Sequence, residues 1–260
     1  MTGTTQRGHT APGRLLYFTD PARAAVDYAL LAYSAPLLAA LPRGDKHPVL
    51  VLPGLNTSDA STYTLRTVLK GLGYKTYGWQ LGRNIGPTSK AVHGTQARLD
   101  YLTNRYQQPV TLIGWSLGGI FARKLARRTP SAVRQVITLG SPIRLARHEQ
   151  SRANRLFHRN SHEHIEPLDL PLERGAGPLP VPATSIYSKL DGILAWRACL
   201  DEPSPRAENI AVLASHFGIT GNPATLWAVA DRLAQPPDRW APFQPPALLR
   251  MAYPAPESRS

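Results

Sequence analysis

The sequence has 260 residues, of which 42% are hydrophobic, and carries a formal net charge of +13 at pH 7. This length suits one domain with a sizeable core, and no apolar run approaches the roughly 18 residues of a membrane span. The basic residues are spread along the chain without a basic helix, interleaved aromatics or a zinc-finger pattern, which argues against nucleic-acid binding and leaves peripheral contact with an anionic membrane open.

Two features predict a cytoplasmic protein without disulfides. The most apolar stretch, residues 29–41, lies well inside the chain behind Asp20 and Asp27, where a secretory signal would not occur. The single cysteine, Cys199, excludes an internal disulfide. No neighbouring residue suggests that its thiol is activated, so we do not expect it to be a nucleophile.

The N-terminal part of the chain predicts a tail followed by a long helix. Residues 1–20 are expected to be a disordered tail, and the helix is expected to begin at Pro21, with Asp20 or Thr19 as its cap. A kink is expected near Pro36. The apolar residues of this helix are expected to pack on the body of the domain.

The rest of the chain alternates between strand and helix patterns. Strands are predicted over 47–52, 74–79, 110–113, 133–139, 183–188 and 209–213, and helices over 58–72, 89–106, 120–128 and 223–233. Such alternation is typical of a parallel sheet with helices on both faces. The predicted fold is therefore a doubly wound, mostly parallel α/β domain over residues 21–235.

Two further segments stand apart from this alternation. Residues 143–182 are polar and then rich in proline and glycine, and an insertion of this length on an α/β sheet predicts a cap or lid. Residues 236–260 are rich in proline and are expected to form a C-terminal tail that lies on the surface or is disordered.

The pentapeptide Gly114-Trp115-Ser116-Leu117-Gly118 joins a buried strand to a helix. A strand that turns into a helix within five residues must fold back sharply, and the two glycines let the chain segments approach each other. The pattern G-x-S-x-G in this context is typical of a nucleophile elbow, which exposes a serine hydroxyl on a strained turn. An ordinary strand-to-helix turn is the alternative.

Three residues that each follow a predicted strand form a candidate catalytic triad. Ligands of an open parallel sheet bind beyond the carboxyl ends of its strands, which is where Ser116, Asp191 and His216 are expected. An imidazole can take the proton of a serine that attacks a carbonyl carbon, and a carboxylate can hold that imidazole in the required tautomer. We therefore predict Ser116 as nucleophile, His216 as base and Asp191 as orienting group.

Further residues complete the predicted site. The backbone N–H groups of Leu117 and Leu55 are predicted to form the oxyanion hole, because one follows the nucleophile and the other lies in the loop after the first strand. Gly54 would let that loop approach the substrate. Trp115 and Phe217 are predicted to contact the substrate as walls of the pocket.

Alternatives remain for two members of the triad. Asp191 could be a turn residue before a glycine, and Asp201 is then the nearest substitute. His216 could be a structural histidine. The histidines at positions 158, 162 and 164 could ligate a metal, but they lack a clear fourth ligand. A solvated or lid-lining role is favoured for them, and no metal is predicted.

Together these residues resemble the α/β-hydrolase superfamily, in particular its bacterial serine lipases and esterases, over roughly residues 49–233. The resemblance is carried by the elbow with Asp191 and His216, by VLVLPGL at 49–55, by GWQLGRNIGP at 78–87, and by HFG and GNP at 216–218 and 221–223. The chain departs from many lipases by having Pro53 where they have a histidine, and Trp115 where a histidine is common beside the serine.

The resemblance implies an enzyme that hydrolyses carboxylic esters, of a small molecule or a lipid, through an acyl-enzyme and without a cofactor. The same triad could serve an acyltransferase or a cofactor-free perhydrolase. A non-catalytic binding module on a retained hydrolase fold is the alternative from another class.

Overall fold

The computed structural model describes residues 10–146, 150–166, 172–173, 176–236 and 239–255. Within these residues one six-stranded parallel sheet has the strand order β2-β1-β3-β4-β5-β6. The strands are β1 (Pro48–Leu52), β2 (Lys75–Gly78), β3 (Val110–Trp115), β4 (Val133–Leu139), β5 (Ala183–Tyr187) and β6 (Ala207–Ala211). The order changes direction between β1 and β3, so a topological switch point lies there. The predicted doubly wound parallel sheet is confirmed.

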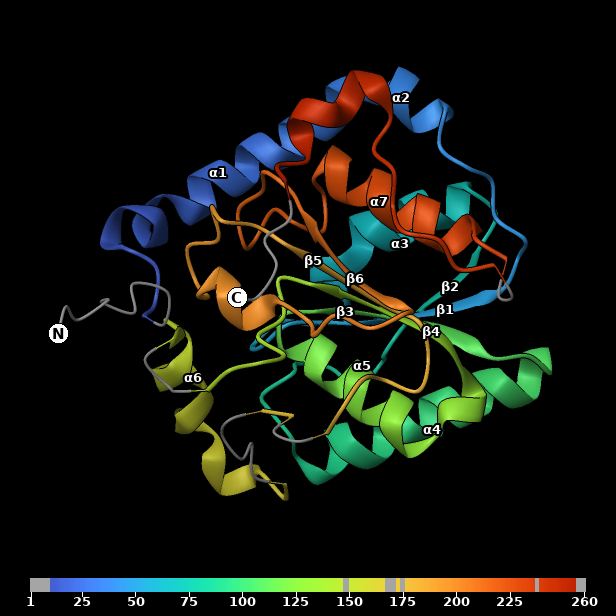
Figure 1. Ribbon diagram of the computed structural model, residues 1–260. Coiled ribbons are helices and arrows are strands. Elements are labelled where there is room, and N and C mark those ends of the chain that lie inside the picture. Colours follow the sequence, from blue (N-terminus) through green and yellow to red (C-terminus); the bar gives the residue numbers. More distant parts are fainter. Residues whose placement is uncertain (1–9, 147–149, 167–171, 174–175, 237–238, 256–260) are drawn as a thin grey trace, which may run out of the picture.

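Helices cover both faces of this sheet, as Figure 1 shows. They are α1 (Arg14–Tyr33), α2 (Ala35–Ala39), α3 (Tyr63–Gly71), α4 (Ser89–Tyr106), α5 (Leu117–Arg128), α6 (Asn154–Arg159) and α7 (Pro223–Ala234). Helices α1, α2, α3 and α7 lie on one side, and α4 and α5 lie on the other. Single 3-10 turns occur at Asp59–Thr62, Pro130–Ala132, Ser161–Glu163, Trp196–Cys199 and Ala247–Ala252.

Alternate residues of the strands pack into two separate hydrophobic cores, one on each face of the sheet. On β1, Val49 and Val51 pack in the core beneath α3 and α7, whereas Leu50 and Leu52 pack in the core beneath α4 and α5. Every residue of β1 and β3 is buried. A sheet covered on both faces requires such continuously apolar strands, which is why these runs were recognisable in the sequence.

The N-terminal helix begins earlier than predicted. Helix α1 starts at Arg14, so residues 14–20, expected in the disordered tail, are helical, and Asp20, expected as the cap, is a fully buried residue inside the helix. Pro21 also lies inside the helix, where it removes one N–H donor without ending the helix. The expected kink near Pro36 is confirmed as a break at Ser34 between α1 and α2. Residues 1–9 lie outside the described residues.

The two segments expected outside the alternation are each described in part. Within 143–182 the structure contains α6 and the Ser161–Glu163 turn, and 147–149, 167–171 and 174–175 lie outside the described residues. The C-terminal segment 239–255 lies on the domain, where the Tyr253 hydroxyl donates a hydrogen bond of 2.7 Å to the carbonyl oxygen of Ala224. Among the described residues, no helix is both long and apolar enough to cross a membrane.

Candidate active site

Ser116 occupies a sharp turn between β3 and α5. Its backbone has φ 52° and ψ −120°, a left-handed conformation that is unusual for a residue with a side chain. A Cβ atom on Gly114 would lie 2.3 Å from the Cα of Gly119, and one on Gly118 would lie 2.3 Å from the carbonyl oxygen of Leu52. The turn therefore needs both glycines, and it holds Ser116 at the carboxyl end of the sheet.

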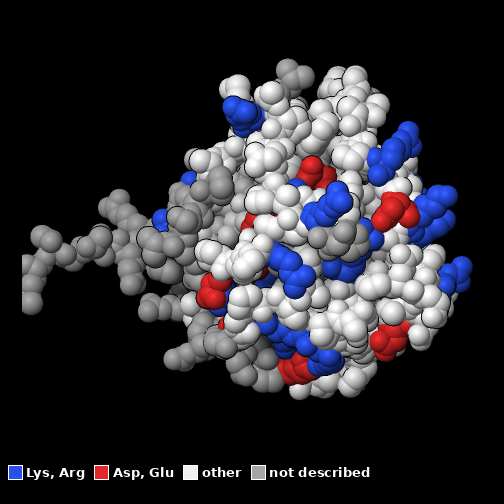
Figure 2. All heavy atoms as spheres, turned by 45° about the vertical axis from the view of Figure 1, so that its right-hand side comes forward, with Lys and Arg blue, Asp and Glu red and all other residues white. Residues whose placement is uncertain are grey.

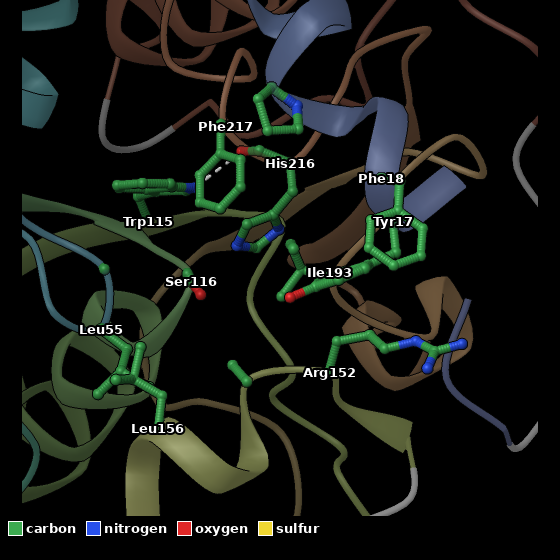
Figure 3. Close-up of a pocket in the computed structure, with 13 residues that line it drawn as sticks. Tyr17, Phe18, Leu55, Trp115, Ser116, Arg152, Leu156, Ile193, His216 and Phe217 are labelled. Atoms are coloured by element: carbon green, nitrogen blue, oxygen red, sulfur yellow. Dashed lines mark hydrogen bonds between the residues drawn. The ribbon is translucent and has the colours of Figure 1, made fainter. Parts of the chain in front are cut away.

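His216 and Asp191 form a buried pair beside this turn. The Nδ1 of His216 lies 2.6 Å from Oδ2 of Asp191, and both residues are 3% exposed. The other carboxylate oxygen of Asp191 accepts hydrogen bonds from the backbone N–H groups of Ile193 (2.8 Å) and Leu194 (2.7 Å). The carboxylate is thus held from both sides and orients the imidazole. Figure 3 shows the His216 ring and the Ser116 hydroxyl facing one pocket, which both residues line.

Asp201, the alternative partner of His216, is engaged elsewhere. Its carboxylate accepts two hydrogen bonds from the guanidinium of Arg123, at 2.5 and 3.0 Å. Arg123 is also bonded through two nitrogens to Glu173, at 2.8 and 2.6 Å. Burial opposes the charge of Arg123, but the two carboxylates outweigh it and raise its pKa. This cluster joins α5, the helix that follows Ser116, to the 143–182 segment.

Two buried aspartates of α1, which the sequence analysis did not single out as site residues, hold the loop of His216. Oδ2 of Asp20 accepts hydrogen bonds from the N–H groups of Gly192 (2.8 Å) and His216 (3.0 Å), and Oδ1 accepts one from Phe217 (3.1 Å). Asp27 accepts from the N–H and the hydroxyl of Ser215, at 2.9 and 2.6 Å. The seven-residue spacing of the two aspartates, which puts both on one face of a largely apolar helix, was the signal available in the sequence.

The loop after β1 lies directly against the elbow. A Cβ atom on Gly54 would be 3.2 Å from the Cβ of Ser116 and 3.1 Å from the Trp115 ring, so this glycine permits a close approach. Asn84 is fully buried, and its Nδ2 donates to the carbonyl oxygen of Pro53 (2.8 Å). Its backbone carbonyl oxygen accepts from the backbone N–H of Asn56 (2.6 Å). The loop that carries Leu55 is therefore braced by a residue whose role the sequence did not reveal.

The aromatic residues beside the triad have different surroundings. Trp115 is 3% exposed, and its indole N–H donates to the carbonyl oxygen of His216 at 3.1 Å, so it supports the histidine loop as well as lining the pocket. Phe217 is 40% exposed and lines the same pocket, with its ring 6.4 Å from that of Trp115.

Two apolar hollows meet at Ser116. One has a volume of about 380 Å³ and lies between the triad and the start of α1, and the other, of about 60 Å³, lies under α6. Leu55, Ser116 and Ala153 line both. The larger is also lined by Tyr17, Phe18, Pro21, Gly54, Trp115, Arg152, Leu156, Ile193, His216 and Phe217, and the smaller by Leu117, Ile120, Pro142, Leu145, Ser151, Asn154, Phe157 and Leu194.

The remaining candidates for chemistry are explained by packing. Cys199 is buried, and burial raises the pKa of its thiol well above the usual value, as expected for a residue that is not a nucleophile. Nε2 of His164 lies 2.9 Å from the carbonyl oxygen of Ile85, and its ring lies 4.7 Å from that of Phe157. Among the described residues, no group of three histidines, cysteines or acidic residues could hold a metal ion.

Comparison with known proteins identifies structural neighbours at low sequence identity. Lipase B of Aspergillus fumigatus superposes with a TM-score of 0.59 at 17% identity, covering 76% of this chain and 55% of its own chain. The Bacillus licheniformis lipase BlEst2 has a TM-score of 0.51 at 16% identity (75% and 94%), and the Paleococcus ferrophilus monoacylglycerol lipase 0.51 at 14% (75% and 96%). This chain therefore spans little more than half of the fungal lipase.

No protein-family model matches the sequence, and no curated protein matches it. At 14 to 17% identity, the similarity to the three lipases is evidence for the fold, and it agrees with the strand order and helix placement described above.

Proposed function

We propose that this chain, which has the α/β-hydrolase fold, is a serine hydrolase that cleaves carboxylic esters. The observation that carries the proposal is the arrangement of three side chains. Ser116 stands on a positive-φ turn, and it shares a pocket with His216, whose Nδ1 is held 2.6 Å from buried Asp191. A strained serine, an oriented imidazole and a buried carboxylate are the parts that acyl-transfer chemistry requires.

In the proposed reaction Nε2 of His216 accepts the Ser116 proton while Oγ attacks the ester carbonyl carbon. The negative tetrahedral oxygen is stabilised by the N–H groups of Leu117 and Leu55. Leu117 is the first residue of α5, so its N–H has no partner within the helix and lies at the positive end of the helix dipole. Collapse of the intermediate expels the alcohol, which takes the proton from His216. Water then attacks the acyl-enzyme by the same steps and releases the acid.

The lining of the site supports an ester with substantial apolar groups as the substrate. Leu55, Leu145 and Phe157 line the smaller hollow, and the larger one is lined by Tyr17, Phe18 and Phe217. Among the structural neighbours, one is named a monoacylglycerol lipase and two are named lipases. We therefore propose acyl or lipid esters as the substrate class, with residues 150–166 as the cap over the site.

The proposal is tested by labelling the folded protein with a fluorophosphonate and by hydrolysis of p-nitrophenyl esters. Ser116→Ala should abolish labelling and lower kcat by at least about 10⁴-fold, because the nucleophile is lost. Ser89→Ala is the control, because Ser89 is an exposed serine at the start of α4. Labelling that persists in Ser116→Ala would refute Ser116 as the nucleophile, and the absence of labelling in the folded wild type would refute the serine-hydrolase proposal.

A further inference from the structure

Helix α1 presents apolar side chains to the outside. Its exposed face carries Leu15, Phe18, Ala22, Val26, Ala29, Leu30 and Tyr33, which we call the outer stripe. The exposed fractions of the five large members are 78% for Leu15, 73% for Phe18, 57% for Val26, 50% for Leu30 and 86% for Tyr33. Their spacing of three and four residues places them on one side of the helix. The expectation that the apolar residues of this helix pack on the domain is wrong for these five.

The two acidic residues of the helix point the other way. Asp20 and Asp27 are buried, and they accept hydrogen bonds from the backbone N–H groups of His216 and Ser215, respectively. Arg23 lies between them and donates to Asp20 (3.2 Å) and to the carbonyl oxygen of Leu190 (2.6 Å). Within α1, which the structure describes throughout, no carboxylate therefore lies on the outward side. A helix that covers a sheet usually turns its apolar side inward and its charged side outward, whereas α1 buries two carboxylates and exposes five large apolar side chains.

The shape of the outer stripe fits a flat surface better than a second copy of the chain. A helix of this length is about 30 Å long and about 10 Å wide, so one stripe offers about 300 Å². Two stripes facing each other would bury about 600 Å², well below the roughly 1,200 to 2,000 Å² of stable protein interfaces. An apolar face of about 300 Å² is comparable to the largest apolar patch of a typical soluble monomer, which is often a functional surface.

The charge around the stripe favours an anionic surface. The chain carries a net charge of +13, and lysine and arginine side chains also outnumber acidic ones on the face in Figure 2, which brings forward the side of the molecule away from the start of α1. Next to α1, exposed Arg152 lies with its guanidinium carbon 5.6 Å from the centre of the Tyr17 ring. Exposed Arg14 begins the helix, and exposed Lys189 precedes Leu190. Basic residues beside an apolar helix face are the pattern that binds anionic lipid headgroups.

The stripe also continues into the candidate active site. Phe18 belongs to the stripe and lines the larger hollow together with Tyr17 and Pro21 of the same helix (Figure 3). A surface that touched the stripe would therefore lie beside the mouth of the pocket. We propose that the outer stripe of α1 docks this protein on the surface of an anionic lipid membrane, with the helix lying in the plane of the interface.

Flotation of the full chain with lipid vesicles tests the proposal. The wild type should float with vesicles of phosphatidylcholine and about one third phosphatidylserine, and much less with phosphatidylcholine alone, because the basic residues need anionic lipid. Val26→Gln combined with Leu30→Gln should lower the partition coefficient on the anionic vesicles by at least about tenfold. Neither residue lines a hollow at Ser116.

Tyr101→Gln combined with Ile165→Gln is the matched control. These two side chains are 48% and 50% exposed, and Tyr101 belongs to α4 on the opposite face of the sheet (Figure 1). The control should float like the wild type. Equal flotation of the stripe variant and the wild type, or no flotation of the wild type with anionic vesicles, would overturn the proposal. Light scattering that shows a wild-type dimer, absent in the stripe variant, together with a lack of flotation would assign the stripe to a second copy.

Docking does not depend on the proposed ester hydrolysis. The same preparations are therefore assayed with a short, soluble p-nitrophenyl ester. Flotation without ester cleavage would leave the docking proposal intact and count against the hydrolase. Cleavage without flotation would leave the hydrolase proposal intact and count against docking. The stripe variant should cleave the soluble ester at the wild-type rate, since its substitutions lie on the outer side of α1.

Discussion

Replacement of Asp20 tests whether α1 positions His216, the proposed base. Asp20 is fully buried, and its carboxylate accepts three backbone hydrogen bonds, from Gly192, His216 and Phe217. A hydrogen bond to a charged acceptor contributes about 1.5 to 3 kcal/mol, and a buried donor left without a partner costs about 1 to 3 kcal/mol. These contributions are not additive, so we expect Asp20→Ala to lower the free energy of unfolding by about 3 to 5 kcal/mol.

The same substitution should lower kcat more than it changes KM. The lost bonds hold the backbone of His216, of Phe217 and of the residue after Asp191, and Asp20 itself lines neither hollow at Ser116. A displacement of the base by about 1 Å can lower a rate by about 10²-fold. Asp20→Asn should recover only part of the activity. It keeps one acceptor, but in either orientation of the amide its NH₂ group faces at least one backbone N–H donor.

Urea unfolding, which gives the free energy of unfolding, and steady-state hydrolysis of a soluble ester without urea, which gives kcat and KM, provide the test. Asp59→Ala is the control, because its carboxylate also accepts two backbone hydrogen bonds at a strand end, from Trp79 and Gln80, both at 3.0 Å. It should lower stability while leaving kcat near the wild-type value. A folded Asp20→Ala protein with wild-type kcat would refute the positioning role. An equal loss of kcat in Asp59→Ala would show that the loss follows from lower stability and not from the position of His216.

Two further predictions concern the segments around the site. Asn84→Ala removes the hydrogen bond to Pro53 and should lower kcat by about 10² to 10³-fold, as the loss of one oxyanion donor does, and an unchanged kcat would show that Asn84 does not position the loop. Burial opposes ionisation of Glu173, but Arg123 and Arg127 outweigh burial and lower its pKa below the usual 4.5. The stabilisation that its charge contributes is therefore present above that pH and is lost as the pH falls through the lowered pKa. Wild type should be more stable than Glu173→Gln at pH 7, and urea unfolding at a series of pH values should show the difference closing as the pH falls below 4.5. A difference that is constant with pH would exclude this ion pair as its source.

The sequence predicted features that depend on nearby residues or on the order of the strands. The helix expected over 89–106 has those bounds in the structure, because Thr88 caps it and Gln107 ends it in a left-handed conformation with φ 51°. Asp191 and His216 could be paired because each follows a strand, and parallel strands end at the same edge of the sheet.

Features that depend on distant partners were missed. The acceptor oxygens of Asp20 meet N–H groups that lie more than 170 positions later in the chain, and no local pattern marks these groups as needing an acceptor. Arg123 belongs to a helix whose apolar spacing was recognised, but its carboxylate partners lie 50 and 78 residues away. Sequence periodicity identifies which residues share a helical face, and it does not identify what that face meets.

Both errors about α1 therefore have one physical cause. The loops after β5 and β6 place the backbone N–H groups of Gly192, Ser215, His216 and Phe217 in the interior, and such groups must find acceptors. Two carboxylates on the inner face of α1 meet that need beside Ala24 and Leu31, which pack inward, and the residues of the outer stripe are left outside. Exposed apolar side chains do not stabilise the isolated chain, and we therefore infer that the outer stripe contacts a partner surface. The helix that orients His216 would then be the one that contacts this surface, and mutations on its two faces should separate the two effects: inner-face substitutions should change kcat, and outer-face substitutions should change vesicle binding.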